Sequence, residues 1–187
     1  TFARRYQYVP PERLRIEVYR SHADFSVRTV GLPGLAASGV SFGTTLAFDS
    51  PAATDIGAFN WGSTVWHEVA HTFTLGLTDN RVPRWLSEGL SVFEEHRARA
   101  GWGMSPSLGW LEAYRQGKMV PPSRMNDGFM RPAYPQQVPY SYLQAGRRVL
   151  TLGSGRVRVL SNPPGDGEQN LESVGLIVEF GEFRALF

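Results

Sequence analysis

Several residue types and patterns are missing from this 187-residue chain, and each absence excludes a class of protein. There is no cysteine, which excludes disulfide frameworks and thiolate zinc sites but leaves the redox compartment open. No apolar run approaches the roughly 20 residues of a membrane-spanning helix. Lys118 is the only lysine and the formal net charge is +2, so no basic cluster indicates nucleic-acid binding.

The remaining composition fits one enzyme-sized domain. A hydrophobic content of 42% over this length is enough for a single core. The residues after Thr1 lack the basic and apolar segments of a signal peptide. We therefore interpret the chain as a piece of a longer protein, and its compartment stays open.

The most informative segment reads His67-Glu-Val-Ala-His71. Residues four apart lie on one face of an α-helix, so both imidazoles can point at one metal ion. Glu68 lies about 100° round the helix, where it can reach a water molecule instead. A zinc ion with three protein ligands keeps a position for water and lowers its pKa, and a nearby carboxylate can take the proton. The segment therefore predicts a catalytic zinc site.

The same pattern also arises by chance on the polar face of a helix. Three features favour the metal site over that alternative. The chain has only four histidines, and two of them are here. An apolar stripe of Val65, Val69 and Phe73 runs beside them with helical spacing. A carboxylate that can complete the ligand set, Glu88, follows His71 after seventeen positions.

Glu88 lies on a second expected helix, which we place at residues 83–100 with Asp79 or Asn80 as its cap. Gly89 would let another backbone pass close to this helix. Glu95 lies two turns after Glu88 on the same face. A ligating histidine usually gives its other ring proton to a carboxylate or carbonyl, and Glu95 is our candidate for that role. The alternative for Glu95 is a solvated helix face, which is the preferred interpretation for Glu94.

Residues 60–96 resemble the gluzincin metallopeptidases, and in particular the bacterial peptidase MA-like domains that often adjoin tetratricopeptide repeats. The resemblance depends on the His-Glu-Val-Ala-His segment and on Pro83-Arg-Trp-Leu-Ser-Glu-Gly. It weakens outwards to residues 12 and 145. It implies that His67, His71 and Glu88 bind Zn²⁺, that Glu68 is the general base, and that the parent protein contains tetratricopeptide repeats. Such a parent would be a cell-envelope or secreted bacterial protein.

The chain also departs from the zinc aminopeptidases of the same clan. Sixteen residues separate His71 from Glu88, where those enzymes have eighteen. The Gly-x-Met-Glu-Asn segment that binds a substrate amine there is missing. Within residues 39–50 only Asp49 could hold a terminal ammonium. We therefore expect cleavage that does not strictly require a free amino terminus.

The order of the expected elements, strands first and helices later, predicts an α+β domain, and the resemblance implies a zincin-like fold. Residues 13–19 alternate as a half-buried strand with Ile16 and Val18 on its apolar face, Ser21 caps a helix to about Val30, and Val40–Phe48 forms a strand. The resemblance implies that Val40–Phe48 is the sheet edge that pairs with an extended peptide. An interior strand without substrate contact is the alternative.

Residues 101–139 contain many glycines, prolines and aromatic side chains, with a short helix expected near 107–116. Beyond them lies Tyr140-Ser-Tyr142. The resemblance implies that a tyrosine there donates a hydrogen bond to the oxyanion. Tyr142 is preferred over Tyr140, since Tyr142-Leu-Gln-Ala145 matches the family pattern. Structural packing is the alternative for both.

From residue 146 the sequence changes character, so we divide the chain into a peptidase domain (1–145) and an atypical tail (146–187). The tail shows no sustained helical period, and residues 155–160 and 174–180 read as short strands. Around Asn162-Pro-Pro-Gly165 it is rich in turn formers. A divergent tail, disorder and a shifted reading frame all remain open.

The sequence therefore predicts a zinc metallopeptidase that acts on a peptide or protein substrate, with no nucleic-acid partner and no membrane-spanning segment. A competing hypothesis is a degenerate zinc-site domain that serves as a binding or scaffolding module. The unusual tail and the absent amine-binding segment are the observations behind it.

Overall fold

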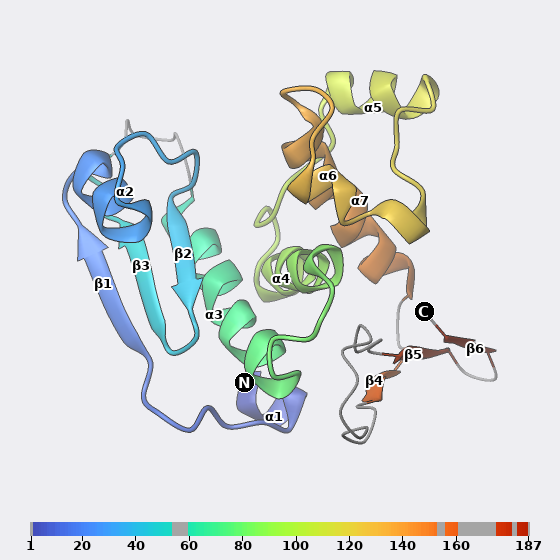
Figure 1. Ribbon diagram of the computed structural model, residues 1–187, viewed down its shortest axis with the longest axis horizontal. Coiled ribbons are helices and arrows are strands. Elements are labelled where there is room, and N and C mark those ends of the chain that lie inside the picture. Colours follow the sequence, from blue (N-terminus) through green and yellow to red (C-terminus); the bar gives the residue numbers. More distant parts are fainter. Residues whose placement is uncertain (1, 54–59, 153–155, 161–174, 181–182, 187) are drawn as a thin grey trace, which may run out of the picture.

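The structure, a computed structural model, describes residues 2–53, 60–152, 156–160, 175–180 and 183–186. Within them the chain is a mixture of helices and small sheets, as the α+β prediction requires (Figure 1). Among these described residues, no helix is both long and apolar enough to cross a membrane. The helices are α1 (Phe2–Tyr6), α2 (His22–Val30), α3 (Trp61–Leu77), α4 (Arg84–Ala98), α5 (Leu108–Arg115), a short 3₁₀ turn (Pro122–Arg124), α6 (Asp127–Met130) and α7 (Gln137–Leu152). The strands are β1 (Arg15–Tyr19), β2 (Gly39–Phe42), β3 (Thr45–Asp49), β4 (Arg156–Leu160), β5 (Gly175–Phe180) and β6 (Phe183–Leu186).

The N-terminal sheet has the strand order β1-β3-β2. β1 runs parallel to β3, and β2 runs antiparallel to it. The prediction of a single strand over Val40–Phe48 is wrong, because a turn at Gly43 and Thr44 divides this segment into two strands. Gly43 has a positive φ of 65°, which glycine adopts without the cost that a side chain would add. The result is an interior strand, β3, and an edge strand, β2.

The two faces of β1 are buried differently from our expectation. Glu17 and Tyr19 face α2, where Arg28 pairs with Glu17 and the Tyr19 ring meets Phe25. Ile16 and Val18, the expected buried pair, are about half exposed at 51% and 48%. The reason is that α3 packs against β2 and β3 and does not extend over β1 (Figure 1).

Helix α3 begins at a cap that the sequence provides locally. Asn60 accepts a hydrogen bond from the backbone N–H of Ser63 at 3.1 Å, which satisfies one of the free donors of the first turn. Its apolar side carries the fully buried Ala70 and the ring of Phe73, which stacks on Phe2 of α1. The other side of α3 is left for polar residues.

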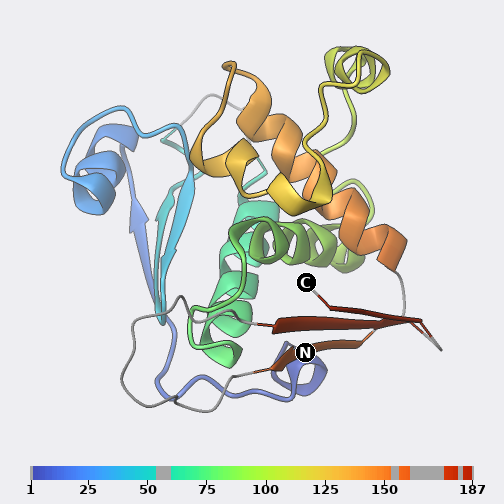
Figure 2. The ribbon, with the colours of Figure 1, turned by 45° about the vertical axis from the view of Figure 1, so that its right-hand side comes forward.

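Helix α4 lies between α3 and α7 (Figure 2). Leu86 is buried in a cluster with Val82 and with Val149 of α7. A Cβ added to Gly89 would lie 2.8 Å from the carbonyl oxygen of Ala145. The expectation that Gly89 allows a close backbone approach is therefore confirmed, and the approaching element is α7.

The start of α4 is capped from a distance. Its first helical residue follows Pro83, which makes no side-chain cap bond. Asp79 and Asn80 are not caps either, because both adopt positive φ in the turn after α3. Instead, the side-chain oxygen of Asn126 accepts the backbone N–H of Trp85 at 3.1 Å.

The segment between α4 and α7 is anchored to α7 as well. Ser107 caps α5 by accepting the N–H of Trp110, which matches the helix expected there. The side-chain oxygen of Gln144 in α7 accepts a hydrogen bond from the backbone N–H of Val120 at 3.1 Å. The side-chain amide nitrogen of Gln144 donates a hydrogen bond to the Val120 carbonyl. Val120 in this segment is therefore held to α7 by two hydrogen bonds.

Helix α7 continues through Gly146 to Leu152, so the expected loss of helix after residue 145 is wrong at this point. A Cβ on Gly146 would lie 2.5 Å from Val92 of α4, so this glycine serves helix packing rather than helix termination.

The strands β4 and β5 coincide with the two predicted strands except for residues 155 and 174, and a third strand, β6, follows. Residues 155, 174 and 162–165 lie outside the described residues, and the division of the chain into two domains stays a prediction.

Candidate metal centre

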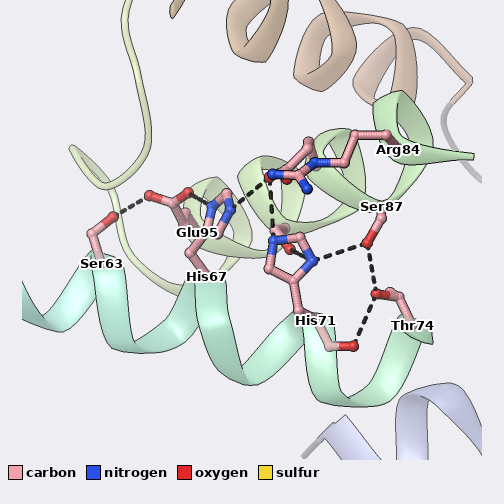
Figure 3. Close-up of polar contacts among 9 residues, drawn as sticks. Ser63, His67, His71, Thr74, Arg84, Ser87 and Glu95 are labelled. Atoms are coloured by element: carbon pink, nitrogen blue, oxygen red, sulfur yellow. Dashed lines mark hydrogen bonds and ion pairs between the residues drawn. The ribbon is translucent and has the colours of Figure 1, made fainter. Parts of the chain in front are cut away.

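Two imidazoles and one carboxylate converge where α3 faces α4. His67 and His71 are one turn apart on α3, with ring centroids separated by 4.9 Å. The Oε2 atom of Glu88 lies 3.1 Å from Nε2 of His67 and 3.2 Å from Nε2 of His71. One oxygen is thus shared by the two ring nitrogens that point away from the helix (Figure 3).

The other nitrogen of each ring is held by a separate partner. Nδ1 of His67 lies 2.6 Å from Oε1 of Glu95, and Nδ1 of His71 lies 2.9 Å from the hydroxyl of Ser87. A carboxylate at Nδ1 fixes the ring orientation and leaves Nε2 free to bind a metal. The structure therefore places Glu95 where the sequence interpretation needs it. It is buried and also accepts the hydroxyl of Ser63.

Glu68 is the carboxylate without a fixed partner. Its ligand atom lies within 4.8 Å of those of His67 and His71, so these three residues alone also form a cluster that can hold a metal ion. Glu88 is the second carboxylate that could serve as a third ligand, because its Oε2 contacts both Nε2 atoms. Among the described residues, Glu68 makes no hydrogen bond or ion pair, which leaves its carboxylate available for a water molecule.

The edge strand β2 approaches the helix at this carboxylate. A Cβ on Gly39, the first residue of β2, would lie 3.0 Å from Cγ of Glu68 and 2.8 Å from the methyl group of Thr64. A larger residue at position 39 would therefore separate the strand from α3. Further along, the hydroxyl of Thr72 donates to the carbonyl of Gly43 at 2.9 Å. Strand β2 thus follows α3 beside the site.

The charges of the cluster are coupled. Burial disfavours the imidazolium of His67, but hydrogen bonds to Glu88 and Glu95 outweigh burial and raise the pKa of His67 to about 10. Burial likewise opposes ionisation of Glu88, yet the two imidazoles hold the pKa of its carboxyl well below the usual range. The protein alone therefore keeps a proton on His67, and a metal ion would replace it.

Burial raises the pKa of Glu68, against the opposing effect of the two imidazoles. A carboxylate with a raised pKa is a better proton acceptor than one in water. Since no hydrogen bond to a described residue occupies it, the arrangement suits a group that takes and returns a proton.

Only one of the two candidate tyrosines reaches this site. The Tyr142 ring lies 6.0 Å from the His67 ring and packs edge-on against Phe129. Its hydroxyl interacts electrostatically with the guanidinium of Arg84, and burial raises its pKa, with the charge of Glu88 as the next cause. Tyr140 instead turns to α5, where a Cβ on Gly109 would lie 2.8 Å from its hydroxyl. The structure therefore brings Tyr142, and not Tyr140, to the cluster.

Four further residues belong to the site that the sequence interpretation did not include. They are Ser63, Arg84, Ser87 and Ser91. Arg84 had a signal in the sequence, since it precedes Glu88 by four residues and can meet it on one helix face. The serines had none, because serine on a helix is as common on solvated faces.

Two further carboxylates differ from what was expected of them. Glu94 is not solvated, because it is 1% exposed and pairs with Arg5 and with the hydroxyl of Tyr6 from α1. Asp49 is fully buried, and its Oδ2 lies 2.8 Å from Nδ1 of His22. A carboxylate in that position cannot hold a substrate ammonium in solvent.

Comparison with known proteins adds no assignment. No protein-family model, no curated protein and no solved structure matches the chain.

Proposed function

We propose that this chain is a zinc-dependent metallopeptidase of the gluzincin type with a zincin-like fold. The observation that carries the proposal is the shared contact of Glu88 Oε2 with Nε2 of both His67 and His71. Two imidazoles and a carboxylate are a donor set that suits catalytic zinc, and both imidazoles have their Nδ1 atoms engaged elsewhere. Zinc held there would polarise a peptide carbonyl and activate water.

The remaining chemistry falls to residues of the chain. Glu68 would take the proton of the attacking water and pass it to the departing amide nitrogen. Tyr142, kept neutral by its raised pKa, would donate a hydrogen bond to the oxygen of the carbonyl as negative charge develops. A donor of this kind contributes about 100-fold or more to a rate.

The substrate in this proposal is an extended peptide that adds to the edge strand β2. Strand β2 pairs with β3 on one side only, among the described residues. Its first residue lies against Glu68, so a peptide on its free edge would pass the proton acceptor. Main-chain hydrogen bonds tolerate varied side chains. With Asp49 buried beside His22, we expect no strict need for a free amino terminus. That the parent protein carries tetratricopeptide repeats stays a prediction.

The test separates chemistry from metal binding. Zinc-loaded protein is incubated with a mixed peptide library, with and without a chelator, beside Glu68→Gln. We expect chelator-sensitive cleavage by the wild type, and a loss of several orders of magnitude in Glu68→Gln at an unchanged zinc content, because the change removes a proton carrier and no ligand. Stoichiometric zinc without cleavage in the wild type would favour the binding or scaffolding module instead. Less than a tenth of an equivalent of zinc after reconstitution would reject both.

A further inference from the structure

Arg84 lies at a position where two local rules disfavour it. It is the first residue of α4, and the first turn of this helix contains no acidic residue. A positive charge at a helix N-terminus is opposed by the helix dipole. The order Arg84 then Glu88 at i,i+4 is also the weaker orientation for an ion pair. Residues that break local rules in this way are often explained by a site.

The contacts of Arg84 supply that explanation. Its Nε lies 2.7 Å from Oε1 of Glu88, while Oε2 of the same carboxylate faces both imidazoles. The guanidinium therefore contacts Oε1, the carboxylate oxygen that neither histidine contacts (Figure 3). Its charge also interacts with the hydroxyl of Tyr142. One side chain thus connects a ligand on α4 to the tyrosine of α7.

We propose that Arg84 is the positioning residue of the metal centre: it restricts Glu88 to binding through one oxygen and holds Tyr142 at the same site. This inference rests on the proposed function, because it needs a metal at the three ligands. Arginine suits the task, since its planar fork of donors can serve two partners in fixed directions. Its side chain is 56% exposed, whereas that of Glu88 is 2% exposed, so replacing Arg84 disturbs less buried packing than replacing Glu88 would.

The experiment compares Arg84→Gln and Arg84→Lys with Arg97→Gln, which removes an exposed arginine from the last turn of the same helix. Zinc dissociation constants are measured by competition with a chromophoric chelator, and folding is checked by circular dichroism. Loss of a partner that orients a ligand typically weakens metal binding by about 10- to 100-fold. We expect that range for Arg84→Gln, a smaller loss for Arg84→Lys, and less than a twofold change for Arg97→Gln.

A second readout addresses Tyr142. At saturating zinc, Arg84→Gln should lower kcat and leave KM nearly unchanged, because the tyrosine acts on the developing charge rather than on the bound substrate. If wild type binds zinc and Arg84→Gln binds it equally well, the inference is overturned while the proposed function stands. If wild type binds no zinc, both are overturned. If Arg84→Gln does not fold, the affinity of Arg84→Lys decides: a value equal to wild type overturns the inference, and an intermediate value supports it.

Discussion

Among the described residues, two histidine–carboxylate groups share residue types but not arrangement. At the end of β3, Nδ1 of His22 meets buried Asp49 at 2.8 Å, and its Nε2 is 3.4 Å from the hydroxyl of Ser26. Both ring nitrogens therefore have partners within the protein. At α3, Nδ1 of His67 is likewise held by a carboxylate, but its Nε2 points at an oxygen that a second imidazole also approaches.

The comparison teaches that a buried histidine beside a carboxylate is not by itself a metal site. What distinguishes the α3 group is the second imidazole one turn away, which places two nitrogens around one point. The His22 group ties α2 to the sheet, since Ser26 also accepts the N–H of Leu35 in the following loop. The α3 arrangement suits metal binding, and the His22 arrangement suits a structural contact.

The largest effect is expected from removing Glu88, the carboxylate of the α3 group, whereas changing Asp49, the carboxylate of the His22 group, serves as the control. Glu88→Ala should weaken zinc binding by more than about 100-fold, because losing a ligand costs more than losing an outer partner. Asp49→Asn should leave the zinc affinity within a few-fold of wild type. Elemental analysis after dialysis and chelator competition measure both. Comparable zinc losses in the two variants would show that the two groups are not distinct in the way proposed.

A smaller effect, about tenfold per pH unit, is expected in the pH dependence of zinc binding. The pKa of His67 is raised to about 10 without metal, so at pH 7 the ring carries a proton that zinc must displace. Apparent affinity should therefore rise from pH 6 to 8, with about one proton released per zinc from this ring. Calorimetry in two buffers of different ionisation enthalpy counts the protons.

Glu95→Gln provides the matched control for this count. Glu95 helps to raise the pKa of His67, so its neutral replacement should reduce the protons released at pH 7. Zinc uptake without proton release in the wild type would contradict the assignment of His67 as a ligand.

The smallest effect concerns the stability that His22 contributes. A hydrogen bond to Asp49 raises the pKa of His22 above its ordinary value. A raised folded-state pKa stabilises the fold fully below the unfolded value of about 6.5, and this gain is lost as pH rises through the folded value. His22→Asn should therefore cost more unfolding free energy at pH 5.5 than at pH 8.5, as measured by urea unfolding of both proteins. An equal or larger cost at pH 8.5 would contradict this sign.

The parts of the site that the sequence predicted are those fixed by helical spacing. His67 and His71 meet because four residues make about one turn. Gly89 could be interpreted correctly because a glycine in a helix usually signals a close neighbour. Ser21 was identified as a helix cap because its bond reaches only three residues ahead, and the helix expected near 107–116 begins with a cap of the same reach at Ser107.

The parts that failed depend on contacts distant in sequence. Nothing local shows that Glu94 meets Arg5, which lies 89 positions away. Tyr140 and Tyr142 are two residues apart, so they point to different sides of α7, and only the docking of that helix decides which one reaches the metal centre. The exposure of Ile16 likewise depends on how far α3 extends over the sheet. Alternation shows that a strand has two faces but not which of them is covered.

The cap on α4 by Asn126 has a consequence for how the molecule would respond to a metal ion at His67, His71 and Glu88. The residue that completes the first turn of the ligand-bearing helix belongs to the segment just before α6, 41 positions later in the chain. An ion that stabilises α4 would therefore also favour the position in which Asn126 caps this helix, by thermodynamic linkage. Amide protons near Asn126 should then exchange more slowly when zinc is bound, although none of them touches the ion. Slower amide exchange in a surface segment that is far in sequence from the metal-binding residues would then report that the metal is bound.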